Sequence, residues 1–317
     1  MTALTVIICA HNPRPEYIEA TLSSIRAQQH DASTEAYEFI IIDNASKTPL
    51  AETLDLSWHQ NARIIVEDKL GLTHARLRSF HESRGDILLY IDDDNILEPD
   101  YFTEVMKAFS ADETLGAIGG KSIPRYEVEP PVWFPETGIG LACRDLGEKR
   151  IDADWPDPKS PDRAYPTCAP IGAGMAIRRR AYATYVEMVE TDPLRQSLGR
   201  KGTDLASGED NDMIMSVLEQ GYSIAYLPQL SLIHLIPGSR VTQAYLERYA
   251  FSSNRTWVQV LDVHGIRPWP AIAAWTSPLR KFRFYLRSKA WTSPVRKIAW
   301  KAVCGRLEGQ ASLDKAA

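Results

Sequence analysis

Three adjacent carboxylates, Asp92, Asp93 and Asp94, follow directly after the apolar run Ile87–Ile91. Such a run is typical of a buried strand, so the three charges should meet where the strand leaves the core. Their mutual repulsion is costly unless a cation lies nearby. Mg²⁺ and Mn²⁺ bind one or two carboxylates together with phosphate oxygens. The triplet therefore predicts a site for a metal ion and a diphosphate, with a solvated acidic loop before a helix as the alternative.

Another carboxylate, Asp43, ends the apolar run Phe39–Ile42. Alone, it indicates an Asx turn. Considered with the triplet, it is placed to accept the imino hydrogen of a nucleotide base, and His11 after the run Leu4–Cys9 is placed to stack on that base. We therefore expect a nucleoside diphosphate to bind between Asp43 and the triplet.

The segments that must position these residues alternate between apolar runs and amphipathic stretches. Buried strands separated by helices predict a parallel sheet, in which ligands bind at the carboxyl ends of the strands. Between residues 121 and 170, many prolines disfavour long helices. The predicted strands are Leu4–Cys9, Phe39–Ile42, Arg63–Val66, Ile87–Ile91 and Ser223–Leu227, and the predicted helices are Pro15–Gln29, Leu72–Glu82, about Ala181–Glu190 and Met213–Gln220.

Five segments together resemble the ordered motif set of family 2 glycosyltransferases with a GT-A fold. They are Val6–Asn12, Phe39–Ser46, Gly71–Arg76, Gly85–Asp94 and Gly208–Asp210. The resemblance covers about residues 4–240 and implies an α/β fold, that of a GT-A type nucleotide-diphospho-sugar transferase with a mostly parallel central sheet. The sequence departs from the usual motifs at Cys9-Ala10-His11, where Pro-Thr-Tyr is common.

The resemblance also implies a nucleotide-sugar site. Asp43 would bind the base, Arg76 the nucleotide and Asp92 the ribose or sugar, with His11 and Asp93 completing the expected site. A UDP-sugar is the favoured donor, with dTDP-sugars and GDP-sugars as alternatives, because a carboxylate can recognise the base edge of each.

The resemblance also implies a metal site and a catalytic general base. Asp94 would bind Mn²⁺ or Mg²⁺, and His234 resembles a late histidine that completes such a site in some GT-A enzymes, although a packed histidine is the alternative. Asp210 would be the general base, with Glu209 as its competitor, because an attacking hydroxyl must lose a proton to a carboxylate within reach. We expect Asp212 to serve the N-terminal dipole of the helix.

These assignments imply an inverting transfer of a sugar from a nucleotide-diphosphate sugar to a hydroxyl of a glycan or glycolipid, in surface polysaccharide biosynthesis. Two alternatives are a noncatalytic nucleotide-sugar binding protein and a metal-dependent nucleotidyltransferase. A nucleotidyltransferase would need a signature Lys or Arg near a Gly-rich N-terminal loop. The segment His11 to Pro15 is not such a loop.

Charge is distributed unevenly along the 317 residues, whose formal net charge is −5. Residues 1–267 carry a net charge of −13, whereas residues 268–306 hold nine basic and no acidic side chains. The acidic balance gives no reason to expect nucleic acid as a partner. No apolar run approaches the roughly 20 residues that span a bilayer, and the four scattered cysteines indicate no disulfide framework, so we expect a cytoplasmic protein.

The basic segment contains an internal repeat in which Ala274–Lys281 recurs as Ala290–Lys297. Each copy predicts a short helix with Ser as N-cap and Pro in the first helical position. We expect a GT-A catalytic domain over 1–240, with halves of about 1–120 and 121–240, and a basic helical C-terminal extension over 241–317. Because basic and aromatic side chains both favour lipid headgroups, we expect the part after Pro268 to be a separable tail, peripheral on an anionic membrane surface at the inner face of the cytoplasmic membrane. The alternative is a helical appendage that docks on the acidic body.

Overall fold

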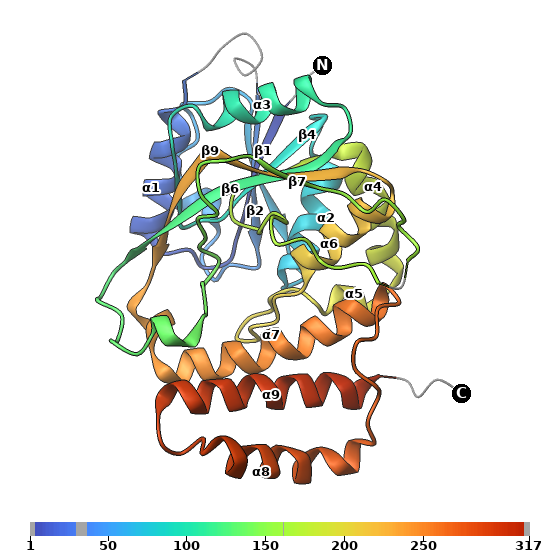
Figure 1. Ribbon diagram of the computed structural model, residues 1–317. Coiled ribbons are helices and arrows are strands. Elements are labelled where there is room, and N and C mark those ends of the chain that lie inside the picture. Colours follow the sequence, from blue (N-terminus) through green and yellow to red (C-terminus); the bar gives the residue numbers. More distant parts are fainter. Residues whose placement is uncertain (1–3, 30–36, 161, 314–317) are drawn as a thin grey trace. The chain divides into compact units, whose positions relative to one another are not determined.

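The computed structural model describes residues 4–29, 37–160 and 162–313, which form two compact units (Figure 1). The first unit contains the chain up to Arg125 together with Ala142–Pro193 and Met213–Leu235. The second contains Tyr126–Leu141, Leu194–Asp212 and the chain from Ile236 onward. Segments far apart in the sequence therefore fold together in each unit.

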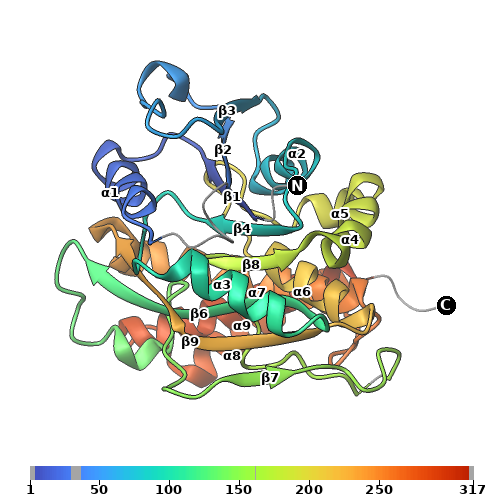
Figure 2. The ribbon, with the colours of Figure 1, turned by 90° about the horizontal axis from the view of Figure 1, so that it is seen from above.

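Four parallel strands form one side of the sheet in the first unit (Figure 2). Their order is β3 (Ala62–Glu67), β2 (Glu38–Asn44), β1 (Leu4–Ala10) and β4 (Ile87–Ile91). They coincide with the four predicted runs to within two residues at each end. The α/β class with parallel strands is therefore confirmed.

Antiparallel pairing completes the nine-stranded sheet. Next to β4 lie β8, β6 and β9 in that order, and both β5 and β7 pair with β9. The strand predicted to end at Leu227 is much longer, because β9 continues to Ile236 and contains His234. The bounds of these strands are β5 Asn95–Leu97, β6 Leu115–Tyr126, β7 Ile151–Ala153, β8 Met175–Arg178 and β9 Ser223–Ile236.

Helices cover both faces of the sheet in the first unit (Figure 2). On one face, α1 (Pro15–Arg26) and α3 (Tyr101–Ala111) bury side chains such as Leu22 and Phe102 in the main core. On the other face, Ala75 of α2 (Leu72–Glu82) packs against β2, and α4 (Arg179–Thr191) contacts α2 and β8. Each fully buried large side chain contributes about 1.5–3 kcal/mol.

Three helices dominate the second unit, with α9 (Pro294–Ser312) in contact with both α7 (Gln243–Val263) and α8 (Ser277–Ser288) (Figure 1).

Within the described residues, no helix has the length and apolar character needed to cross a bilayer. The remaining helices are α5 Pro193–Gln196 and α6 Glu209–Glu219, and the 3-10 turns are η1 Leu50–Glu52, η2 Pro135–Thr137, η3 Gly238–Val241 and η4 Ala274–Thr276.

The two copies of the repeat differ in structure. The second matches the prediction at its start, because the Ser293 side chain accepts a hydrogen bond from the Arg296 N–H at 3.3 Å, but this helix is 19 residues long rather than short. In the first copy Ser277 is the first helical residue and is not the N-cap, because the 3-10 turn η4 ends immediately before it. The turn shifts the start of the helix by one position.

The segment after Pro268 is not a separable tail. Its helix α9 lies against α7 so closely that a Cβ atom at Gly305 would stand 2.0 Å from the carbonyl oxygen of Phe251. Lys297 of α9 also forms an ion pair with Glu247 of α7, with Nζ 3.0 Å from the carboxylate oxygen. Removal of this segment would uncover the apolar face of α7, so it stabilises the unit.

Gly305→Ala should lower the melting temperature, although Ala normally favours a helix interior over Gly by about 1 kcal/mol. The added methyl group would meet backbone, which has little freedom to retreat. Thermal unfolding followed by circular dichroism measures the change. A melting temperature equal to or above that of the parent chain would show that α7 and α9 do not pack at this distance.

Candidate functional site

The predicted donor residues lie at the carboxyl edge of the parallel strands. Ala10 of β1 is in register with Asp43 of β2, and Ile8 of β1 is in register with Ile91, the last residue of β4. His11 and Asp92 follow these strands directly. The sheet therefore brings the ends of three strands to one edge, as the sequence predicted.

The acidic triplet is organised by Asn95, which sequence reasoning did not single out. The fully buried Asn95 accepts a hydrogen bond from the Asp92 N–H at 3.0 Å and donates one to the Asp94 carboxylate at 3.3 Å. Asp92 and Asp93 are partly exposed, whereas Asp94 is only 4% exposed. One carboxylate of the three is thus turned into the protein.

Asp94 meets the buried side chain of His234, whose Nε2 lies 3.2 Å from Oδ1 of Asp94. Antiparallel pairing of β5 with β9 sets this contact, because Asn95 is in register with His234 and the Leu235 N–H donates to the Asp94 carbonyl at 2.8 Å. Cys143 Sγ lies 3.6 Å from the other ring nitrogen. Burial disfavours the charged imidazole, but the hydrogen bonds to Asp94 and Cys143 prevail and raise the pKa of His234 to about 10.

The donor set of Asp94 and His234 fits a Mn²⁺ or Mg²⁺ ion bound together with a diphosphate. The described residues contain no group of three or more His, Cys, Asp or Glu side chains able to hold a metal. Such ions keep several waters and take one or two protein ligands plus phosphate oxygens, so two buried donors are sufficient. The imidazole favours Mn²⁺ over Mg²⁺, which prefers oxygen ligands.

The carboxylate of Asp43 is buried and holds the loop that follows β2. It accepts hydrogen bonds from the N–H groups of Ser46 at 3.1 Å and Leu50 at 2.8 Å. This is the turn geometry that the sequence offered as the alternative to base binding. A carboxylate has about four acceptor positions, so these bonds leave capacity for a base.

The His11 ring is held by the loop next to it. Its Nδ1 lies 2.7 Å from the Asn44 carbonyl oxygen, which only accepts, so Nδ1 carries the proton. Nε2 then accepts from the Asn12 amide at 2.8 Å. Asn12 also accepts from the Lys47 N–H, and it adopts a left-handed φ of 49°. His11 is exposed and oriented, as a residue that stacks on a ligand would need to be.

Asn44 and Arg76 connect the donor edge to α2. The Asn44 side chain accepts from the Gly71 N–H at 2.8 Å and donates to the Lys69 carbonyl at 2.9 Å. Arg76 is 3% exposed, and its guanidinium carbon lies 5.3 Å from the centre of the Tyr90 ring. The aromatic face stabilises the buried cation and fixes its position.

The pair Glu209 and Asp210 begins α6, as predicted. Glu209 is 2% exposed, whereas Asp210 is partly exposed. Tyr249 of α7 lies near this point: burial raises the pKa of its hydroxyl, and the charge of Asp210 adds to the effect. Of the two carboxylates, Asp210 is the more accessible to an acceptor hydroxyl.

Asp212 lies in the first turn of α6, as predicted, and has buried partners that the sequence did not indicate. It is fully buried, and its Oδ1 accepts hydrogen bonds from Arg195 Nη1 at 2.5 Å and from His264 Nε2 at 2.8 Å. Besides its place at the N-terminal end of the helix dipole, Asp212 therefore pairs with the buried guanidinium of Arg195 and bonds the His264 ring. Because these three residues join α5, α6 and α7, they hold the first turn of α6 in place. Sequence reasoning missed Arg195 and His264, which lie 17 and 52 residues from Asp212.

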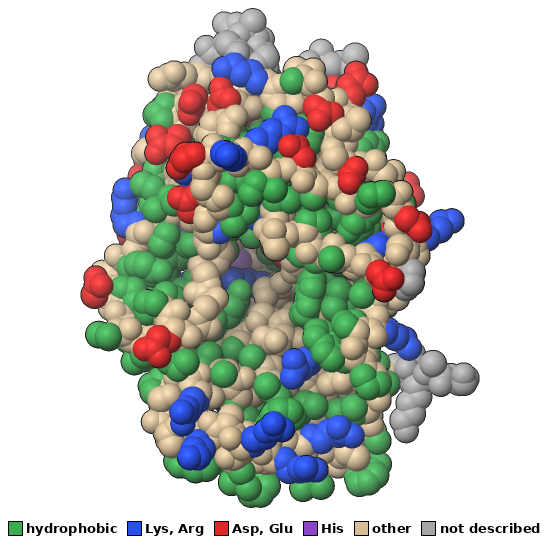
Figure 3. Space-filling model, viewed as in Figure 1, with side chains coloured by type: hydrophobic (Ala, Val, Ile, Leu, Met, Phe, Trp, Pro, Cys, Tyr) green, Lys and Arg blue, Asp and Glu red, His purple; other side chains and the backbone are tan. Residues whose placement is uncertain are grey.

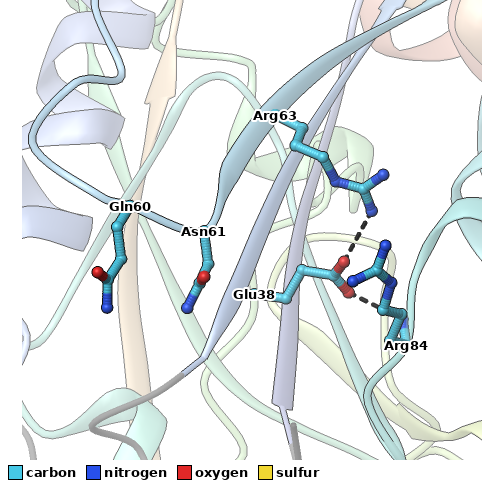
Figure 4. A pocket seen from close by; sticks show the side chains of 5 residues that line it. All are labelled: Glu38, Gln60, Asn61, Arg63 and Arg84. Carbon is cyan, nitrogen blue, oxygen red and sulfur yellow. Dashed lines mark hydrogen bonds and ion pairs between the residues drawn. The ribbon is translucent and has the colours of Figure 1, made fainter.

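A pocket of about 200 Å³ lies at the opposite, amino-terminal edge of the parallel strands (Figure 4). Its lining includes Glu38, whose carboxylate accepts from Arg63 at 2.7 Å and from the Arg84 N–H at 2.8 Å. The side chains that line it form their own ion pair, and none of them belongs to the predicted site. This pocket is not the donor site.

Comparisons with known proteins identify the family of the chain. The sequence pattern of "Glycosyl transferase family 2" matches residues 5–185, more than half of the chain. An N-acetylglucosaminyltransferase of Mesorhizobium japonicum is 23% identical over 243 residues, which are 75% of this chain and 52% of that protein. The chain thus spans about half the length of that relative.

Two further proteins are similar to the chain, one in sequence and one in structure. The succinoglycan biosynthesis protein ExoM of Rhizobium meliloti is 24% identical over 244 residues, which cover 68% of this chain and 66% of ExoM. The mannosyltransferase PcManGT from Pyrobaculum calidifontis, solved with GDP-Man and Mn²⁺, is similar in structure with a TM-score of 0.54 and 19% identity, over 93% of this chain and 73% of that one. This last similarity supports the GT-A fold.

The predicted fold class and the predicted family are therefore confirmed. The chain belongs to glycosyl transferase family 2.

Proposed function

We propose that this glycosyltransferase transfers a sugar, with inversion, from a nucleotide-diphosphate sugar to a hydroxyl of a glycan or glycolipid acceptor in surface polysaccharide biosynthesis. The observation that carries the proposal is the buried pair of Asp94 and His234, 3.2 Å apart at the carboxyl edge of the sheet. A buried carboxylate next to a buried imidazole suits a divalent cation. ExoM, named for succinoglycan biosynthesis, supports the choice of product class.

Asp94 and His234 would hold Mn²⁺ or Mg²⁺ through a carboxylate oxygen and Nε2. When bound, the ion supplies positive charge that stabilises the departing nucleoside diphosphate. The Mn²⁺ in the PcManGT complex supports this cofactor. Asn95 fixes the carboxylate of Asp94, and the loop of Asp92 and Asp93 offers partly exposed carboxylates to the ribose or sugar hydroxyls.

The nucleotide is proposed to lie along the carboxyl edge of the sheet. Asp43 would accept the imino hydrogen of the base, His11 would stack on the base, and Arg76 would place positive charge near the nucleotide. A UDP-sugar is the preferred donor in this proposal, and dTDP-sugars and GDP-sugars are the alternatives; GDP-Man in PcManGT shows the last class in a structural relative.

Asp210 is proposed as the general base. Its partial exposure supports this role over that of Glu209, which is nearly inaccessible. The buried bonds of Asp212 to Arg195 and His264 would keep the first turn of α6 rigid, and a base must be held within hydrogen-bond reach of the proton that it removes.

The proposal also places the reaction at an anionic membrane surface, with peripheral attachment. The nine basic side chains and the tryptophans of residues 268–306 support this location. A glycolipid acceptor would then be presented at the same surface.

Asp94→Ala should weaken Mn²⁺-dependent binding of UDP at least tenfold, and His234→Gln should weaken it in the same direction, because each change removes one of the two buried donors. Isothermal titration calorimetry with UDP, with and without Mn²⁺, measures the effect. The exposed carboxylate of Asp100 provides a matched control, so Asp100→Ala should bind like the parent. Unchanged Mn²⁺ dependence in Asp94→Ala would remove Asp94 from the metal site.

Asp43→Ala should weaken binding of UDP with Mn²⁺ much more than binding of pyrophosphate with Mn²⁺, because only UDP carries a base. The parallel variant Asp43→Asn keeps one side-chain acceptor for the loop bonds to Ser46 and Leu50 and separates loop support from base binding. An equal loss for both ligands would make Asp43 purely structural.

Asp210→Asn should lower kcat by about 10² or more while the affinity for the donor changes little, because the amide keeps the shape of the helix start and removes the base. Glu209→Gln is the matched control and should retain the higher rate of the two variants. Steady-state kinetics with a competent acceptor gives the comparison. If Glu209→Gln were inactive and Asp210→Asn active, Glu209 and not Asp210 would be the general base.

A further inference from the structure

Exposed hydrophobic side chains gather around α8. Among the described residues, twelve large hydrophobic side chains are notably exposed, and six of them fall between positions 275 and 291. These six are Trp275, Leu279, Phe282, Phe284, Leu286 and Trp291. Large apolar groups are rarely left together in water unless something covers them.

Four of these residues form a single ridge. Leu279, Phe282 and Leu286 are spaced by three and four positions in α8, so they lie on one face of the helix, and Trp275 stands four positions before Leu279, in the 3-10 turn η4. Their exposed fractions are 83% for Trp275, 64% for Leu279, 57% for Phe282 and 49% for Leu286.

A different face of α8 packs against α9. Tyr285 packs edge-on against Trp300, with ring centres 5.0 Å apart, and the Trp300 indole donates to the Lys281 carbonyl at 2.9 Å. Lys281 also pairs with Glu308. These contacts determine the rotation of α8 about its axis, so the ridge is held outward without taking part in the packing.

A row of arginines runs beside the ridge. Arg280, Arg283 and Arg287 are all exposed and follow one another at helical spacing. Figure 3 shows Lys and Arg side chains next to hydrophobic ones over the region of α8 and α9. No Asp or Glu occurs between residues 268 and 306, so this segment adds only basic charge to the apolar surface.

We propose that α8 lies flat on an anionic bilayer, with the ridge of Trp275, Leu279, Phe282 and Leu286 inserted below the headgroups and the arginine row on the lipid phosphates. This surface goes beyond the proposed electrostatic attachment, because it assigns one helix and adds apolar insertion. It extends the proposed function, but it does not depend on the assignment of any catalytic residue.

Charge complementarity favours a bilayer over a second copy of this chain. In a two-fold symmetric dimer the same patch meets itself, so the arginine row of one copy would approach that of the other. The segment offers no carboxylate to relieve the repulsion. Anionic lipid headgroups provide the opposite charge, and the acyl chains below them accept the ridge.

Cosedimentation of the full chain with vesicles tests the proposal, using phosphatidylcholine alone and phosphatidylcholine with 30% phosphatidylglycerol. The parent should bind the anionic vesicles, and a measurable part of the binding should persist at 0.5 M NaCl, where exposed charges are screened beyond about 4–5 Å. Phe282→Ser with Leu286→Ser should lower the partition coefficient at least tenfold at both salt concentrations. Arg283→Gln with Arg287→Gln should lower binding mainly at low salt and reduce the preference for anionic lipid.

Val132→Ser is the matched control, because Val132 is 96% exposed and lies outside α8; it should bind like the parent. Asp94→Ala should also bind vesicles like the parent, which separates failure of this proposal from failure of the proposed catalysis. No binding of the parent to anionic vesicles at low salt, or equal binding by the ridge variant, would overturn the proposal. A parent dimer that the ridge variant converts to a monomer, without vesicle binding, would instead identify a second copy as the occupant.

Discussion

The burial of the Asp94 charge beside His234 is the constraint on which the donor edge depends. A carboxylate that is 4% exposed needs a cation or several hydrogen-bond donors, and here Asn95 and His234 provide them. His234 reaches this position only because β9 is long and pairs antiparallel with β5, which brings together residues 140 positions apart in the chain. The proton between His234 Nε2 and the Asp94 carboxylate competes with a metal ion, because the ion would bind these same two atoms.

The environments of the carboxylates separate their roles. Asp43 accepts two backbone N–H groups, which hold a loop and leave capacity for a base, and Asp212 is buried between Arg195 and His264, which hold the start of α6. Asp92, Asp93 and Asp210 remain partly exposed and are the ones able to meet sugar hydroxyls or water. Acidic residues close together in the sequence therefore act as structural, ligand-binding and catalytic candidates according to what surrounds them.

Local patterns were sufficient for the parallel half of the fold and for the position of Asp43 and the triplet at one edge, because apolar runs and strand ends are local features. The antiparallel half was less predictable, since the extension of β9 to Ile236 is decided by pairing with β5, β6 and β7. The partners of Asp212 were also hidden, because Arg195 and His264 become its neighbours only through the fold. The basic segment was predicted as a separable tail, but Gly305 and Gly309 let α9 pack directly against the backbone of α7, and a count of charges cannot reveal such packing.

Crystals soaked with Mn²⁺ and UDP, with diffraction measured at the manganese absorption edge, test the central claim most directly. The account predicts one strong anomalous peak within bonding distance of a carboxylate oxygen of Asp94 and of Nε2 of His234, with the UDP phosphates on the same ion. If the peak lay at this edge of the sheet but not within bonding distance of His234, the histidine would be a packed residue and not a metal ligand. An anomalous peak elsewhere, with UDP bound and Asp94 still paired to His234, would contradict the account.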